Sequence, residues 1–233
     1  MHGQPFQSPV PSQDDPTGIA LLGVLAGPEQ ELLQSVYRAS LLKFGDEWER
    51  SIAGKETFWI NLWQRSGSGE KMPVEGIDEL DAWARWMADN AYPEDSVELD
   101  GYGWVVNPIG SRPQEWHIDY AHDYSSIFIP LTRLTEHNCI QYLVLPPALS
   151  GETWSRATAD LDRVDIEYLV DHCDYVSVRQ LLVKPFSVTK LDFQTIHRAI
   201  SNTGDFHRSV FWLSVKKKGE ELLPEEPLVE IAH

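Results

Sequence analysis

The chain has 233 residues, 42% of them hydrophobic, which is enough for one substantial core in a single domain. Its formal net charge of −17 argues against a nucleic-acid partner, because that average field repels a phosphate backbone. No apolar run reaches the length of a membrane span, and the N-terminus lacks the basic start and apolar stretch of a secretory signal. We therefore expect a cytoplasmic protein with no membrane partner.

The first hundred residues are predicted to be an arm followed by helices. Residues 1–17 are rich in Pro, Ser, Gln and Asp, which is typical of a flexible arm. Residues 28–52 begin with a proline suited to a first helical turn, and apolar residues then recur at helical spacing. The predicted apolar face is Leu32, Val36, Ala39 and Leu42.

Residues 58–76 have a centre rich in Gly and Ser between aromatic flanks. This pattern fits a lid over a barrel mouth, and it fits a plain connection between helices equally well. Residues 77–92 then predict a second helix, with acidic residues in its first turn. Its predicted apolar face is Leu80, Trp83, Ala84 and Met87.

After Asp100 the chain consists of short segments rich in β-branched and aromatic residues, separated by Gly, Pro, Asn or Asp. The predicted strands are 102–110, 115–120, 125–134, 139–146, 175–185, 186–193 and 208–217. Between them only residues 157–174 have a helical pattern. Helices followed by strands predict a mainly β fold with flanking helices, as an antiparallel barrel or double-sheet jelly roll. The predicted single domain covers residues 18–233, with a helical part at 18–99, a core at about 100–217 and a tail at 218–233.

Cysteine and lysine patterns add two smaller predictions. The only cysteines are Cys139 and Cys173, so a disulfide framework and a four-cysteine zinc site are excluded, and we expect buried free thiols. The run from Lys216 to Lys218 is expected to be a solvated strand end.

The stretch EWHIDYAHD, residues 115–123, contains two candidate metal-binding pairs. Alternate residues of a strand face the same side, so His117 and Asp119 would point together, with Cα atoms about 6.5 Å apart. A helix would instead pair Asp119 with His122 or Asp123, but the apolar alternation of the segment favours a strand. We therefore interpret His122 and Asp123 as turn residues.

An imidazole and a carboxylate are two ligands of the facial triad of non-haem Fe(II) oxygenases, and this triad needs a second histidine. His197 follows a predicted strand, and Arg208 stands eleven residues further on, at the start of the last strand. Alone, the His-x-Asp pattern fits a structural histidine on a sheet just as well, and Arg208 fits a surface arginine with an acidic partner.

Together, Gln114, His117-x-Asp119, His197 and Arg208 resemble the Fe(II)/2-oxoglutarate-dependent dioxygenases, in particular their phytanoyl-CoA dioxygenase-like branch. The resemblance covers residues 100–217 and implies a double-stranded β-helix, the cupin-like jelly-roll barrel. It implies that His117, Asp119 and His197 hold Fe(II), and that Arg208 binds the far carboxylate of 2-oxoglutarate.

The resemblance also suggests further cosubstrate contacts. Gln114 precedes the metal pair as in the family, and the hydroxyl of Ser209 is a weaker candidate, because strand alternation places it opposite Arg208. Lys190 is the rival cation, since some relatives use a lysine from another strand.

The implied activity couples oxidative decarboxylation of 2-oxoglutarate to hydroxylation, or a related oxidation, of a small molecule by O2. The acidic balance favours a neutral or cationic substrate. Two other functions remain open. A cupin-like metalloenzyme that does not use 2-oxoglutarate predicts a further His or Glu ligand and no role for Arg208. A barrel without catalysis would serve as an interaction module.

Overall fold

The structure is a computed structural model that describes residues 19–65, 69–92, 97–117, 124–144, 176–192 and 195–217. The predicted arm, the predicted helix at 157–174 and the predicted tail lie outside these residues, as do Cys173, Asp119, His122 and Asp123. No helix in the described ranges is both long and apolar enough to cross a membrane.

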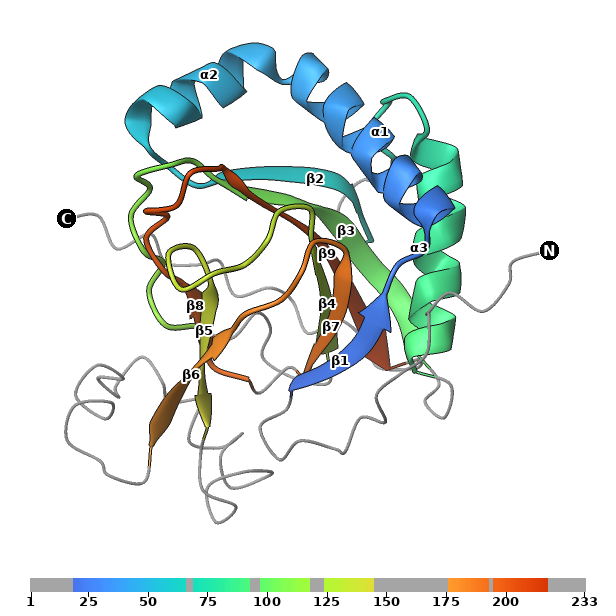
Figure 1. The fold of residues 1–233 in the computed structure, drawn as a ribbon. Helices are drawn as coiled ribbons and strands as arrows, with labels where there is room; N and C mark the ends of the chain where they lie inside the picture. The colour runs from blue at the N-terminus through green and yellow to red at the C-terminus, as the bar shows by residue number, and fades with distance from the viewer. Residues whose placement is uncertain are drawn as a thin grey trace.

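Three helices and nine strands are described (Figure 1). The helices are α1 (Gly27–Lys43), α2 (Gly45–Gly54) and α3 (Ile77–Ala91). The strands are β1 (Ile19–Val24), β2 (Phe58–Gln64), β3 (Val97–Asn107), β4 (Tyr124–Pro130), β5 (Ile140–Val144), β6 (Ser177–Leu181), β7 (Ser187–Asp192), β8 (His197–Ala199) and β9 (Arg208–Lys217).

The strands form two antiparallel sheets. The larger sheet has the order β1-β7-β4-β9-β3-β2, and the smaller sheet has the order β6-β5-β8. From β3 onward the chain alternates between them: β4, β7 and β9 join the larger sheet, while β5, β6 and β8 join the smaller one. This alternation is compatible with a double-sheet jelly roll. The predicted mainly β fold with flanking helices is therefore what the described residues show.

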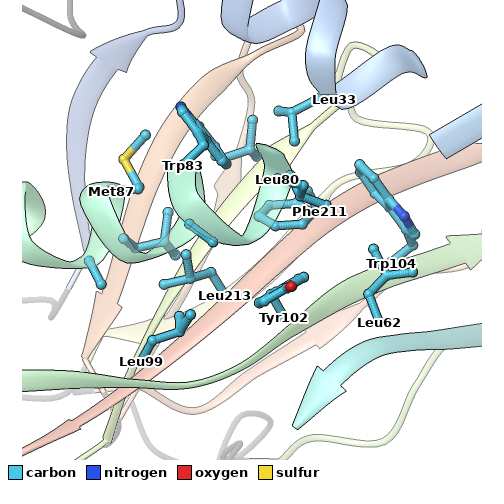
Figure 2. Packing of buried hydrophobic residues seen from close by; sticks show 14 of the residues in the cluster. Leu33, Leu62, Leu80, Trp83, Met87, Leu99, Tyr102, Trp104, Phe211 and Leu213 are labelled. Atoms are coloured by element: carbon cyan, nitrogen blue, oxygen red, sulfur yellow. The ribbon is translucent and has the colours of Figure 1, made fainter. Parts of the chain in front are cut away.

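The main hydrophobic core lies between the helices and the larger sheet (Figure 1). Figure 2 shows Trp83 and Met87 of α3 above the side chains of β3 and β9. The Phe211 ring packs edge-on against Trp104 at a centroid distance of 4.9 Å, a favoured aromatic geometry. The predicted apolar face of α3 is confirmed, since all four of its residues are buried.

The predicted helix at 28–52 is two helices, and its predicted face is partly wrong. Phe44 leaves helical geometry between α1 and α2, where Gly45 and two acidic residues begin a new first turn. The buried residues of α1 are Leu33, Val36 and Ser40, whereas Leu42 is 86% exposed. Ser40 is tolerated inside because its hydroxyl donates to the Val36 carbonyl at 2.7 Å.

Residues 58–64 form neither a lid nor a helix connection. They are strand β2, at the edge of the larger sheet, paired with β3. Together with β1, this strand adds β structure to the segment that was expected to be helical.

The interpretation of Lys216 as a solvated strand end is wrong. Its strand, β9, is paired on both sides, by β3 and β4, and Lys216 is 5% exposed. Its Nζ atom lies 3.5 Å from the Glu98 carboxylate, which also contacts Arg65. The contact with Arg65 lowers the pKa of Glu98, so this carboxylate stays charged and can balance the buried lysine.

Candidate functional site

A cavity of about 260 Å³ lies between the two sheets. One wall consists of side chains from β2, β3, β4 and β9, and the other of side chains from β5, β8 and residues 114–117. Apolar side chains of both sheets form a second, smaller core, and three of its residues, Phe128, Ile140 and Trp212, also line the cavity. The cavity is therefore built by the sheet pairing itself, in the position where double-sheet folds carry ligands.

Two predicted metal ligands lie side by side on one wall of this cavity. His117 and His197 form an antiparallel bridge, in which each backbone N–H donates to the other's carbonyl, at 3.0 and 2.9 Å. Their imidazole rings have centroids 4.6 Å apart, and both side chains line the cavity. The sheet thus brings together two histidines that are 80 positions apart in the chain, as the facial-triad hypothesis requires.

The tautomers of both histidines are set by the backbone. Nδ1 of His117 lies 2.8 Å from the Glu115 carbonyl, and Nδ1 of His197 lies 2.9 Å from the Thr195 carbonyl. A carbonyl only accepts, so each Nδ1 carries a proton, and in the neutral imidazole Nε2 then carries the lone pair. A backbone carbonyl that accepts from Nδ1 is a usual partner of histidines that bind a metal through Nε2.

The third predicted ligand, Asp119, lies outside the described residues and stays a prediction. Within the described ranges, no group of three His, Cys, Asp or Glu side chains is placed to hold a metal ion. The choice between the first pair and the pair His122 and Asp123 is likewise untested, since both of these residues are outside the described ranges.

Arg208 is a buried cation at one wall of the cavity, and only 1% of its surface is exposed. Its Nε donates to Asn107 Oδ1 at 3.2 Å, and its Nη1 donates to the carbonyls of Asn138 and Cys139, both at 2.9 Å. All of these acceptors are neutral. The buried Nη2 finds no hydrogen-bond partner among the residues that the structure describes.

The charge of Arg208 is therefore uncompensated by the described side chains. Burial lowers the pKa of Arg208 to about 10, which still leaves it a cation at neutral pH. Burial also raises the pKa of the adjacent Cys139 thiol, so this group is neutral and gives no counter-charge. The alternative of a surface arginine with an acidic partner is wrong. A buried guanidinium with no counter-charge among the described side chains is costly.

Asn107, the last residue of β3, is a further site residue, and it lines the cavity. Its Nδ2 donates to Thr57 Oγ1 at 2.7 Å, which turns Oδ1 toward Arg208. Its carbonyl accepts from Asn202 Nδ2 at 2.9 Å. No local pattern indicates this role, because the partners are 101 and 95 positions away.

Of the other predicted cosubstrate contacts, one reaches the cavity and two lie on the helix side of the larger sheet. Gln114 lines the cavity beside the histidines, and its Oε1 accepts from the Ala199 N–H at 3.1 Å. Ser209 does not reach the cavity: its hydroxyl lies 2.6 Å from Tyr37 Oη, on the helix side of β9. That prediction is corrected, because adjacent strand residues face opposite sides. Lys190 is also absent from the cavity wall, and its Nζ sits 4.0 Å above the Tyr92 ring.

No protein-family model and no curated protein matches the chain. Solved structures do match it. SnoK, a non-heme alpha ketoglutarate dependent carbocyclase from nogalamycin biosynthesis, superposes with a TM-score of 0.62 at 16% identity, over 92% of this chain and 87% of that one. AviO1 from Streptomyces viridochromogenes Tue57 gives a TM-score of 0.57 at 17% identity, over 89% and 93%.

EvdO2 from Micromonospora carbonacea var. aurantiaca gives a TM-score of 0.57 at 18% identity, over 95% of this chain and 97% of that one. The same enzyme complexed with 2-oxoglutarate gives 0.51 at 18%, over 90% of each chain. At these identities the likeness concerns the fold. Over most of its length the chain has the fold that these structures share, and one of them is a non-heme alpha ketoglutarate dependent carbocyclase.

Proposed function

We propose that the chain is an Fe(II)- and 2-oxoglutarate-dependent oxygenase. In this proposal His117, Asp119 and His197 hold the iron, and Arg208 holds the far carboxylate of 2-oxoglutarate. When bound, the iron, the cosubstrate and O2 supply the oxidising chemistry: 2-oxoglutarate is converted to succinate and CO2, and a small-molecule substrate is hydroxylated or otherwise oxidised.

The observation that carries the proposal is the buried Arg208 guanidinium at the cavity wall, whose Nη2 has no partner among the described residues. The described residues offer this cation only neutral acceptors, so a carboxylate from a ligand is the partner that its chemistry demands. Two of the five guanidinium N–H groups point from Nη2, and a planar fork of this kind matches a carboxylate. The far end of 2-oxoglutarate supplies that group.

The histidines fit the metal in the same way. Each has its proton on Nδ1, held by a backbone carbonyl, and its lone pair on Nε2. Two neutral imidazoles with one carboxylate form the triad that leaves three iron positions for cosubstrate and O2. The residues present therefore fit the groups that the fold family uses.

The alternative metalloenzyme predicts a further His or Glu ligand and gives Arg208 no role. The described cavity wall contains no such ligand, and it does contain Arg208. A barrel without catalysis has no need for an uncompensated buried cation beside two oriented imidazoles. Both observations favour the oxygenase.

The test is calorimetric titration of 2-oxoglutarate into the protein loaded with Mn(II), which does not turn over. Removing one partner of a buried charge pair typically costs about 2–5 kcal/mol, so Arg208→Ala should weaken binding by about 30-fold or more. Arg208→Lys should recover only part of this affinity, because a point charge does not reproduce the two-pronged contact.

Lys190→Ala is the matched control, since it removes a cation from the opposite face of the sheet. It should bind 2-oxoglutarate as the wild type does, and all variants should keep the metal. If Lys190→Ala loses affinity while folded Arg208→Ala keeps it, the assignment of Arg208 is wrong.

A further inference from the structure

Edge strand β2 contributes three side chains to the cavity: Trp59, Asn61 and Gln64. The remaining side chains at the centre of the strand, Ile60, Leu62 and Trp63, are buried in the main core beneath the helices. The strand thus has a fully packed face and a face that borders the cavity.

The three cavity-lining positions do not follow simple alternation, and an irregularity in the strand explains this. Pairing with β3 shifts register between Asn61 and Trp63. Leu62 and Trp63 consequently both enter the core, and the following residue, Gln64, is returned to the cavity side. Bulges of this kind re-aim a side chain, and they are common beside binding sites.

A glycine on the neighbouring strand makes room for this geometry. A Cβ atom at Gly103 would lie 2.1 Å from the Ile60 carbonyl oxygen, so only glycine lets β2 approach so closely. The position of the three side chains is therefore built into the sheet.

These three side chains are uncharged, and together they offer an aromatic ring and hydrogen-bonding groups. Trp59 borders the cavity and is 51% exposed, so its indole is accessible to a ligand. Trp212, which lines the same cavity, is buried. The carboxamides of Asn61 and Gln64 both donate and accept hydrogen bonds. Apart from Arg208 and the two histidines, no side chain on the described cavity wall is ionisable.

We propose that β2 forms the substrate subsite and that it binds a neutral molecule containing a ring. The face of the ring packs on Trp59, and hydroxyl or amide groups of the molecule form hydrogen bonds with Asn61 and Gln64. This deepens the proposed function, on which it rests for the reaction at the iron. Stacking on an accessible indole needs no charge, and a carboxylate or phosphate would find no cation on β2.

The experiment uses saturation-transfer NMR on the full chain with Zn(II), which is diamagnetic, and 2-oxoglutarate. The probes are two pairs that differ in charge: phenyl β-glucoside with phenyl β-glucuronide, and benzamide with benzoate. At least one neutral probe should receive saturation more strongly than its anionic partner. Trp59→Ala should weaken that binding by about three- to tenfold, the usual effect of one aromatic contact.

Two control variants test whether weaker binding by Trp59→Ala comes from the lost contact or from loss of the fold. Trp59→Phe keeps a ring and should retain most of the binding. Phe206→Ala removes an aromatic that is 70% exposed outside the cavity wall, and it should bind as the wild type does. The 2-oxoglutarate affinity should stay within about twofold in all three variants, because β2 does not hold Arg208.

Equal binding in Trp59→Ala, stronger binding of the anionic probes, or binding of no neutral probe would each overturn the subsite. Failure of the proposed function looks different. In that case 2-oxoglutarate does not bind the wild type, while the ring probes still depend on Trp59.

Discussion

The two faces of strand β9 differ sharply, although their residues alternate along one strand. On the helix side, Ser209 bonds Tyr37, and Phe211, Leu213 and Val215 are buried in the main core (Figure 2). On the cavity side, Arg208 is just as buried and has a cavity beside it, but among the described residues it has only neutral acceptors and one nitrogen without a partner.

This difference separates stability from function. The helix face buries apolar surface, which stabilises the fold by about 1.5–3 kcal/mol for each large side chain. The cavity face of β9 carries a desolvated cation, and two oriented imidazoles lie on the opposite wall of the same cavity. These groups contribute little to folding and become favourable only when a ligand compensates them. Substitutions on the two faces should therefore have separate effects on folding and on binding.

The largest expected effect on folding is at Phe211. Phe211→Ala should lower the free energy of unfolding by about 3–5 kcal/mol, because it opens a cavity among Trp83, Tyr102 and Trp104. Urea denaturation measures this loss. Phe206→Ala, which removes an exposed ring, should change stability by less than about 0.5 kcal/mol. A loss below about 1 kcal/mol for Phe211→Ala would mean that the helix face is not the main source of stability.

A smaller effect, with opposite signs for folding and binding, is expected at Asn107. Asn107→Asp places a carboxylate against Arg208 Nε at nearly unchanged shape, and so gives the buried cation a partner. Stability should stay equal or rise, while 2-oxoglutarate binding should weaken by about tenfold, since the ligand then competes with an internal carboxylate. Asn107→Leu tests the contact alone and should weaken binding by removing the acceptor that orients Arg208. Unchanged 2-oxoglutarate affinity in both variants would show that Asn107 does not position the guanidinium.

The smallest effect is expected at Ser209. Ser209→Ala should cost about 1 kcal/mol of stability, the usual value for one hydrogen bond, and should leave 2-oxoglutarate affinity unchanged. Tyr37→Phe removes the same bond, so the double variant should lose less than the sum of the two single losses. Weaker 2-oxoglutarate binding in Ser209→Ala would instead show that Ser209 contributes to the cosubstrate site.

Local patterns in the sequence predicted those features that depend on local order. The apolar face of α3 follows helical periodicity, and most strands after Asp100 are bounded by turn residues, so both were found. Strand β2 was missed because the register shift between Asn61 and Trp63 interrupts its alternation. The exposure of Leu42 and the burial of Lys216 depend on which neighbours cover them, and periodicity does not contain that information.

The same distinction between local sequence patterns and contacts between distant residues applies to the site. The meeting of His117 with His197 and the place of Arg208 follow from residue types at family spacing, and the structure brings all three to one cavity. Asn107 donates a hydrogen bond to Thr57 and accepts one from Arg208, which join segments 50 and 101 positions apart, so no short pattern reveals them. Ser209 failed for a simpler reason, since it lies on the other face of its strand.

In the proposed enzyme, two oriented imidazoles and a carboxylate would hold an iron ion, and the enzyme would consume 2-oxoglutarate. Succinate formation from 2-oxoglutarate tests this proposal most directly, measured under O2 with and without Fe(II), in the wild type, His117→Ala, His197→Ala and Lys190→Ala. We predict Fe(II)-dependent succinate in the wild type and in Lys190→Ala, and its loss in both histidine variants with the fold retained. Succinate formation by His197→Ala at the wild-type rate, or a wild type that binds Fe(II) but makes no succinate with any substrate offered, would contradict the account.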